Sequence, residues 1–101
     1  KFEEFSQIND MIVCEIVESF KNEMRTVALA LYKSQDQALV QKFMKNMSPP
    51  VAHGFKEATG ELHNVTIGEQ TGARYRMITK SRELESQGKF VLKKYSAHYA
   101  D

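Results

Sequence analysis

The chain has 101 residues, of which 42% are hydrophobic and 27% are charged, and its formal net charge is +1. This length allows one modest hydrophobic core, so we treat residues 1–101 as a single domain. The longest apolar run is the six residues Val27–Tyr32, which is too short for a membrane span of about 20 residues. One cysteine excludes an internal disulfide, and no Cys/His cluster has zinc spacing, so neither a metal nor a cofactor is predicted.

The two ends of the chain carry opposite charge. Residues 1–23 hold two lysines against six carboxylates, a net of −4, whereas residues 70–101 hold seven Lys/Arg against three carboxylates, a net of +4. This asymmetry is typical of contact with an anionic partner, of two differently solvated faces, or of complementary ends that meet in a dimer.

Residues 2–32 have the pattern of one long helix. Apolar residues recur every four positions from Ile8 to Met24, and further apolar residues lie beside this row at 100° per residue. The resulting face covers nearly half of the helix, so it either packs only within its own domain or also forms part of a dimer seam. The residues predicted for this seam are Phe5, Ile8, Ile12, Ile16 and Phe20.

Two shorter helices are predicted next. Ser34 begins a capping-box pattern with Gln37, which starts a helix that ends at Ser48–Pro50 because proline disfavours helix at the preceding residue. A third helix is expected from about Pro50 to Glu61, although two glycines weaken its helix propensity.

The last forty residues change character. β-branched residues and partial two-residue alternation predict three antiparallel strands, at about 63–69, 73–80 and 89–97, with residues 81–88 as a loop. The predicted fold class is therefore α+β. The competing interpretation is a helix over residues 73–87, which would make the chain an all-α helical bundle.

A resemblance to a known family accompanies this pattern. The stretch Phe55–Leu62, with its glycine near a helix end, and the stretch Gly88–Tyr95, with its Gly-Lys-Phe-Val sequence, resemble the middle of small members of the nuclear transport factor 2 and ketosteroid isomerase superfamily. The resemblance implies a cone-shaped fold with a pocket or a dimer platform. It carries over no site residue.

Catalytic chemistry has little support in the sequence. His53 and Glu57 are four residues apart on the predicted third helix, a spacing that lets a carboxylate orient a histidine for proton transfer. The alternative is a solvated polar face. Cys14 has apolar or acidic neighbours, which indicate an inert thiol. No catalytic residue is therefore predicted.

The basic C-terminal third offers an anion-binding alternative. On a strand, Arg74, Arg76 and Lys80 share one face, at a spacing that suits a phosphate backbone. The candidate anion-binding residues are Arg74, Arg76, Lys80, Lys93 and Lys94.

Three hypotheses follow for function. The leading one is a non-enzymatic protein-interaction module that forms a homodimer through its N-terminal helix. The alternatives are binding of nucleic acid or another anionic partner, and a small-molecule pocket protein or enzyme of the cone-fold type. We expect a cytoplasmic protein, or an exported one if the absence of an initiator methionine reflects signal cleavage.

Overall fold

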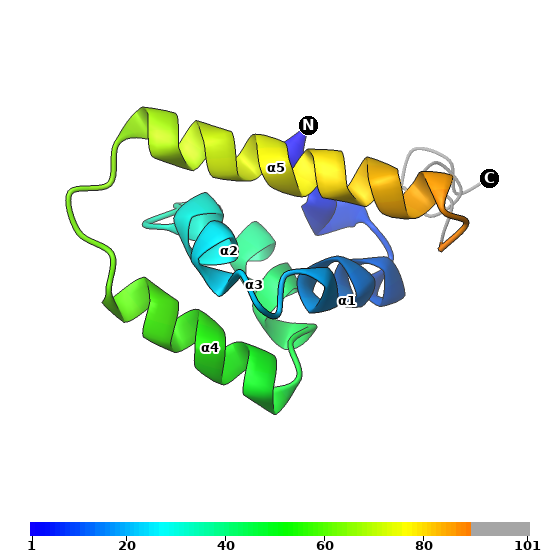
Figure 1. Cartoon of the computed structure of the whole chain (residues 1–101), viewed down its shortest axis with the longest axis horizontal. Coiled ribbons are helices and arrows are strands. Elements are labelled where there is room, and N and C mark those ends of the chain that lie inside the picture. Colours follow the sequence, from blue (N-terminus) through cyan, green and yellow to red (C-terminus); the bar gives the residue numbers. More distant parts are fainter. Residues whose placement is uncertain (90–101) are drawn as a thin grey trace.

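The computed structural model describes residues 1–89, which form one short 3-10 helix and five α-helices. In chain order they are η1 (Phe2–Gln7), α1 (Asp10–Ser19), α2 (Met24–Leu31), α3 (Gln37–Lys45), α4 (Pro49–Gly60) and α5 (Ile67–Ser86). Helix α2 lies between α4 and α5, as Figure 1 shows. The 3-10 helix η1 packs on α3 and α5, and α1 packs on the same two helices.

The predicted continuous helix over residues 2–32 is wrong, because the chain turns at residue 9 and again at residues 20–23. The Asn9 side chain accepts a hydrogen bond from the Met11 N–H at 2.8 Å and begins α1 as its N-cap. At the other end, the Phe20 N–H donates to the Val17 carbonyl at 3.0 Å. The apolar residues expected on one wide face are thus distributed over three elements, which all turn toward one core.

That core contains the side chains of every described helix. Its largest fully buried members are Phe20, Phe43, Ile16, Leu39, Met77, Val13, Val17 and Val27. The Phe43 ring stacks on Phe2 and meets Phe5 edge to face, with both centroid distances at 5.7 Å. These three rings attach η1 to α3.

The two middle helices lie close to where the sequence predicts them. Asp36, rather than Ser34, caps α3, because its carboxylate accepts the Leu39 N–H at 3.1 Å. Helix α4 begins at Pro49, where a missing N–H costs nothing in the first turn. The prediction of a helix from about Pro50 to Glu61 is confirmed to within one residue at each end.

The predicted α+β class is wrong. Residues 1–89 contain no sheet, and residues 67–86 form the single helix α5. Thr66 and Glu69 start it with a complete capping box, in which the Thr66 hydroxyl accepts the Glu69 N–H at 3.0 Å and Glu69 accepts the Thr66 N–H at 2.9 Å. The expected alternation over 73–79 also fails, since Ala73 and Met77 are buried whereas Tyr75 is 68% exposed. Burial every fourth residue is the helical period.

The competing helical interpretation of residues 73–87 is therefore the one that the structure shows, and α5 extends it toward the N-terminus. The third predicted strand, at 89–97, lies outside the described residues except for Lys89. Without a sheet in residues 1–89, the cone-shaped fold implied by the resemblance is wrong as well.

Candidate functional site

Helix α4 presents one face to α2 and leaves the other face to solvent. Val51 and Phe55 are its buried residues, at 5% and 8% exposure, and they pack into the core. Gly54 faces Met24 so closely that a Cβ on this glycine would lie 3.3 Å from Met24 Cγ. This close packing fixes α4 on α2 and determines which of its residues face outward.

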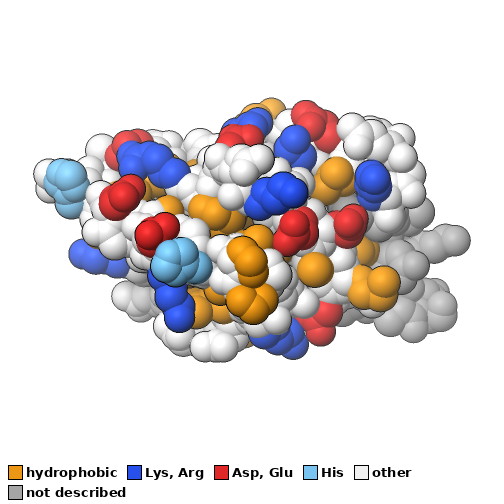
Figure 2. Space-filling model, turned by 60° about the horizontal axis from the view of Figure 1, so that its bottom comes forward, with side chains coloured by type: hydrophobic (Ala, Val, Ile, Leu, Met, Phe, Trp, Pro, Cys, Tyr) orange, Lys and Arg blue, Asp and Glu red, His pale blue; other side chains and the backbone are white. Residues whose placement is uncertain are grey.

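The outward face of α4, which we define as His53, Lys56 and Glu57 together with the C-cap residue Glu61, carries both signs of charge. His53 Nε2 lies 3.4 Å from Glu57 Oε2, and the two side chains are 74% and 67% exposed. Figure 2 turns this side of the molecule forward and shows histidine, Lys/Arg and Asp/Glu side chains mixed over it, with hydrophobic side chains between them. This side of the molecule is therefore a polar, solvated surface that carries both signs of charge.

The predicted pair of His53 and Glu57 does form, but it lies in open water. General acid–base catalysis needs a substrate held within hydrogen-bond reach of the acid or base. No other part of residues 1–89 encloses this pair, because both side chains are mostly exposed on the outward face of α4. Among residues 1–89, no group of three or more His, Cys, Asp or Glu side chains is placed to hold a metal ion.

The residues predicted for a dimer seam all lie in the core. Their exposed fractions range from 0% for Ile16 and Phe20 to 9% for Ile8. They therefore cover one another and the other helices of the same chain, and they are not on its surface. The exposed side of α1 carries Met11, Cys14 and Glu15 instead.

The described anion-binding candidates do not form one surface. On a helix, Arg74 and Arg76 point in nearly opposite directions. Arg74 donates to the Ala30 carbonyl at 2.8 Å and lies 3.6 Å from Glu3, whereas Arg76 binds Glu23.

Lys80 is 3.6 Å from Glu83, so the three described candidates each have a carboxylate partner in their own chain. Lys93 and Lys94 lie outside the described residues. Anion binding by the C-terminal third therefore stays a prediction, and these contacts give it no support.

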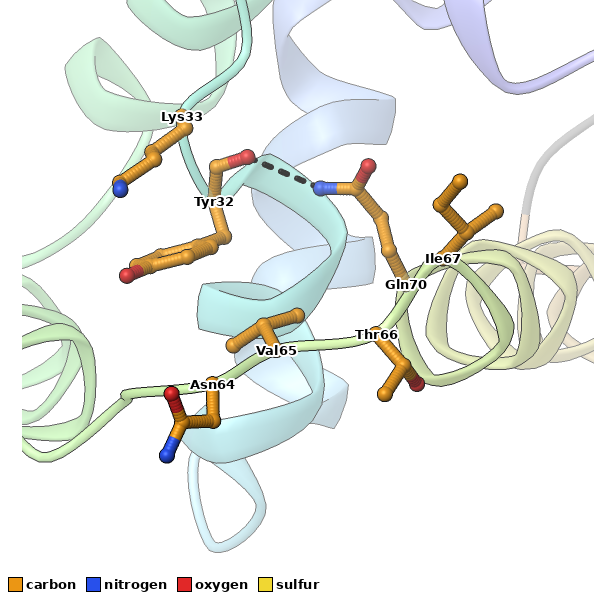
Figure 3. Close-up of a pocket in the computed structure, with 7 residues that line it drawn as sticks. All are labelled: Tyr32, Lys33, Asn64, Val65, Thr66, Ile67 and Gln70. Atoms are coloured by element: carbon orange, nitrogen blue, oxygen red, sulfur yellow. Dashed lines mark hydrogen bonds between the residues drawn. The ribbon is translucent and has the colours of Figure 1, made fainter.

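A second surface feature was missed by the sequence analysis. An open hollow forms where the turn after α2 meets the segment before α5, and it is lined by Tyr32, Lys33, Asn64, Val65, Thr66, Ile67 and Gln70 (Figure 3). Its two walls are about thirty positions apart in the chain, and no sequence motif spans both of them. No pattern in the sequence indicates that they meet.

Fold and surface together define a class of protein. The described part of the chain is an all-helical domain whose helix α4 presents charges of both signs to solvent. No helix within residues 1–89 has the length and apolar character to cross a membrane.

The model of one protein family matches residues 1–92, and that family is described as the FliG C-terminal domain. The chain therefore belongs to the FliG C-terminal domain family, whose members are all-helical domains of the flagellar motor switch. No individual curated protein matches the chain significantly.

This membership corrects the resemblance to the nuclear transport factor 2 and ketosteroid isomerase superfamily, which is wrong. It also gives the chain a non-enzymatic protein-interaction role in the motor switch, as part of an assembly with other motor proteins. The coarse functional prediction, a non-enzymatic protein-interaction module, is thereby confirmed.

Proposed function

We propose that this chain docks another protein of the flagellar motor through the outward face of α4. The observation that carries the proposal is the placement of this helix, which is fixed on α2 by buried residues while His53 and Glu57 remain 74% and 67% exposed. Family membership supports a protein partner rather than a small molecule. It also supports our prediction of a cytoplasmic location.

The chemistry of this face favours an electrostatic contact. Lys56 is not in an ion pair within residues 1–89, and Glu61 likewise has no partner among them. Charged groups of both signs along one helix set the orientation and rate of docking more than its raw affinity. A partner with a complementary order of charges would therefore bind in one register.

Charge reversal tests this proposal. The wild-type chain and the variants Lys56→Glu and Glu57→Lys would be titrated with the cytoplasmic parts of the motor proteins from the same organism, by calorimetry at low and high salt. We expect each variant to weaken binding by roughly two- to tenfold at low salt, with a smaller difference at high salt. Arg82→Glu on α5 is the matched control and should bind like the wild type.

Unchanged affinity in both α4 variants would show that the partner docks elsewhere. A loss in Arg82→Glu equal to that in Lys56→Glu would show a general charge effect. Circular dichroism of each variant confirms that the helices remain folded, which is expected because the substituted side chains are exposed.

Self-association stays a prediction, and we propose a different surface for it. The expected seam is buried, so a second copy would contact the exposed side of α1, where Met11 is 77% exposed. Sedimentation at increasing concentration tests this. A dimer that dissociates in Met11→Lys supports the proposal, and a monomer at every concentration rejects it.

A further inference from the structure

The hollow between the two loops has a volume of about 440 Å³ and opens to solvent. Figure 3 shows how its lining is arranged: the Tyr32 ring projects from the end of α2, Lys33 extends beside it, and Val65 and Asn64 approach from the segment before α5. Tyr32 and Val65 are half-buried and pack against the core, so their exposed surfaces supply the apolar part of a lining that is otherwise polar.

Hydrogen bonds hold the two loops together. The Gln70 side-chain amide donates to the Leu29 carbonyl at 3.0 Å and to the Tyr32 carbonyl at 2.9 Å, which ties α5 to the end of α2. The capping box of Thr66 and Glu69 fixes the other wall at the start of α5. The hollow is therefore formed by connected elements and does not depend on a free loop.

The backbone on both sides adopts an uncommon conformation. Lys33 and Asn64 have φ angles of 50° and 54°, and they are the non-glycine residues with positive φ in the described chain. Asparagine tolerates this left-handed region, whereas lysine rarely adopts it. Such conformations persist where the surrounding contacts enforce them, and they are enriched at binding sites.

The polar groups at the rim are free to bind a ligand. The Lys33 ammonium lies 5.4 Å from the centre of the Tyr32 ring, a cation–π distance that holds it above the apolar wall. Within residues 1–89, Lys33 takes part in no ion pair, and the Asn64 side chain has no hydrogen-bond partner. The hollow thus combines apolar walls with one unneutralised cation and one free amide.

We propose that this hollow binds an acidic segment of a partner protein. An aliphatic side chain of that segment packs between Tyr32 and Val65, while one flanking carboxylate pairs with Lys33 and the other accepts from the Asn64 amide on the far side of the Tyr32 ring. The inference rests on the proposed protein-docking function and adds a second contact to it, at the opposite end of the loop that joins α4 to α5. A small inorganic anion would leave the apolar walls without a partner, so a peptide fits better.

Titration of the isotope-labelled chain with three peptides tests this. The probes are acetyl-Glu-Leu-Glu-amide, its uncharged counterpart acetyl-Gln-Leu-Gln-amide, and acetyl-Glu-Gly-Glu-amide, which lacks the aliphatic side chain. Backbone amide shifts are followed by NMR. We expect the first peptide to shift amides at residues 32–33 and 64–70 and to bind more tightly than the other two.

Substitutions assign the contacts. Lys33→Asn removes the charge but keeps a residue that tolerates the left-handed backbone, and Val65→Thr keeps the shape of the wall while adding a hydroxyl. Lys33→Asn should weaken binding of the first peptide by roughly two- to fivefold, the range expected for one partly exposed ion pair. Val65→Thr should also weaken it, because the hydroxyl disrupts the apolar contact with the leucine side chain. Lys21→Asn removes the same charge from the turn after α1 and is the matched control.

The outcomes separate this inference from the proposed function. Shifts that map outside the hollow, equal binding of the Glu and Gln peptides, or wild-type affinity in Lys33→Asn would each overturn the inference. Lys56→Glu on α4 should leave peptide binding unchanged. If that variant also binds motor proteins normally, the α4 proposal fails while the hollow is still supported.

Discussion

Arg76 binds both carboxylate oxygens of Glu23, at 2.9 and 3.1 Å, although the two residues are 53 positions apart in the chain. The contact joins α5 to the turn before α2. The Arg76 guanidinium also lies 5.7 Å from the centre of the Phe20 ring, so the same side chain covers part of the core. Arg76 was predicted to bind an external anion, but in the structure it links α5 to the turn before α2 within the same chain.

We expect Arg76→Ala to lower the free energy of unfolding by about 1 kcal/mol, because both partners are nearly half exposed and such pairs contribute little. Arg76→Lys should restore only part of the lost free energy, because an ammonium can donate to Glu23 but lacks the planar guanidinium that lies over the Phe20 ring. A double-mutant cycle with Glu23→Gln, measured by urea denaturation, isolates the pair. Additive losses in the cycle would show that the two side chains do not interact.

Asp10 at the start of α1 gives the fold a pH dependence in acid. A hydrogen bond from the Asn46 amide and the nearby Lys42 ammonium, at 3.0 and 2.9 Å, lower the pKa of Asp10 from 3.8 to about 2. A carboxyl group whose pKa is lower in the folded state than in the unfolded state stabilises the fold at any pH above its unfolded-state pKa. This stabilisation is lost as the pH falls through its folded-state pKa.

Asp10→Asn should therefore be less stable than the wild type near neutral pH, and the difference should shrink between about pH 4 and about pH 2. Unfolding by urea across this range measures it, and NMR titration of the Asp10 carboxyl group checks the pKa directly. Glu15→Gln removes one negative charge from the exposed side of the same helix and is the control. A constant difference over this pH range would contradict the prediction.

Phe43 connects η1 to the rest of the core. Its ring is fully buried between Phe2 and Phe5, so Phe43→Ala should cost about 3–5 kcal/mol of unfolding free energy, and Phe43→Leu distinctly less. Met44, the next residue, is 37% exposed, and Met44→Ala should stay within about 0.5 kcal/mol of the wild type. Similar losses in the two alanine variants would show that η1 does not pack on α3 as described.

Periodicity identified which residues are buried but not what covers them. The predicted seam from Phe5 to Phe20 is apolar at the correct positions, and all of these positions are buried. Their cover is α3 and α5 of the same chain rather than a second copy. Local signals such as the Asn9 cap divide residues 2–32 into short helices. The spacing of apolar residues does not show where the chain turns between these helices.

The sheet was predicted from β-branched residues at 65–67 and from partial two-residue alternation over 73–79. Ala73 and Met77 lie four positions apart, a spacing that fits both a strand and a helix, so this pair could not distinguish them. The decisive signal was the capping box of Thr66 and Glu69, which precedes the alternating stretch and marks a helix start. The hollow was beyond sequence reasoning for a different reason. Its walls at Tyr32 and Val65 meet because α2 and α5 pack on each other and Gln70 bonds across to the end of α2, and both are tertiary contacts.

Glycines inside the helices offer a last test of the fold. Gly72 lies in the interior of α5, and a Cβ there would meet no atom within 4 Å, so Gly72→Ala should stabilise the chain by about 1 kcal/mol through helix propensity. Gly54→Ala should stabilise the chain less than Gly72→Ala, because the new Cβ would lie only 3.3 Å from Met24 Cγ. Gly88→Ala should destabilise, since Gly88 has a φ of +81°.

Thermal unfolding ranks the three variants, with a shift of roughly 4–8 °C for each kcal/mol in a domain of this size. The expected order of melting temperature is Gly72→Ala, then Gly54→Ala, then Gly88→Ala. A destabilised Gly72→Ala would mean that residue 72 does not lie within an exposed helical turn, and it would contradict the single helix α5 on which the hollow and the core both depend.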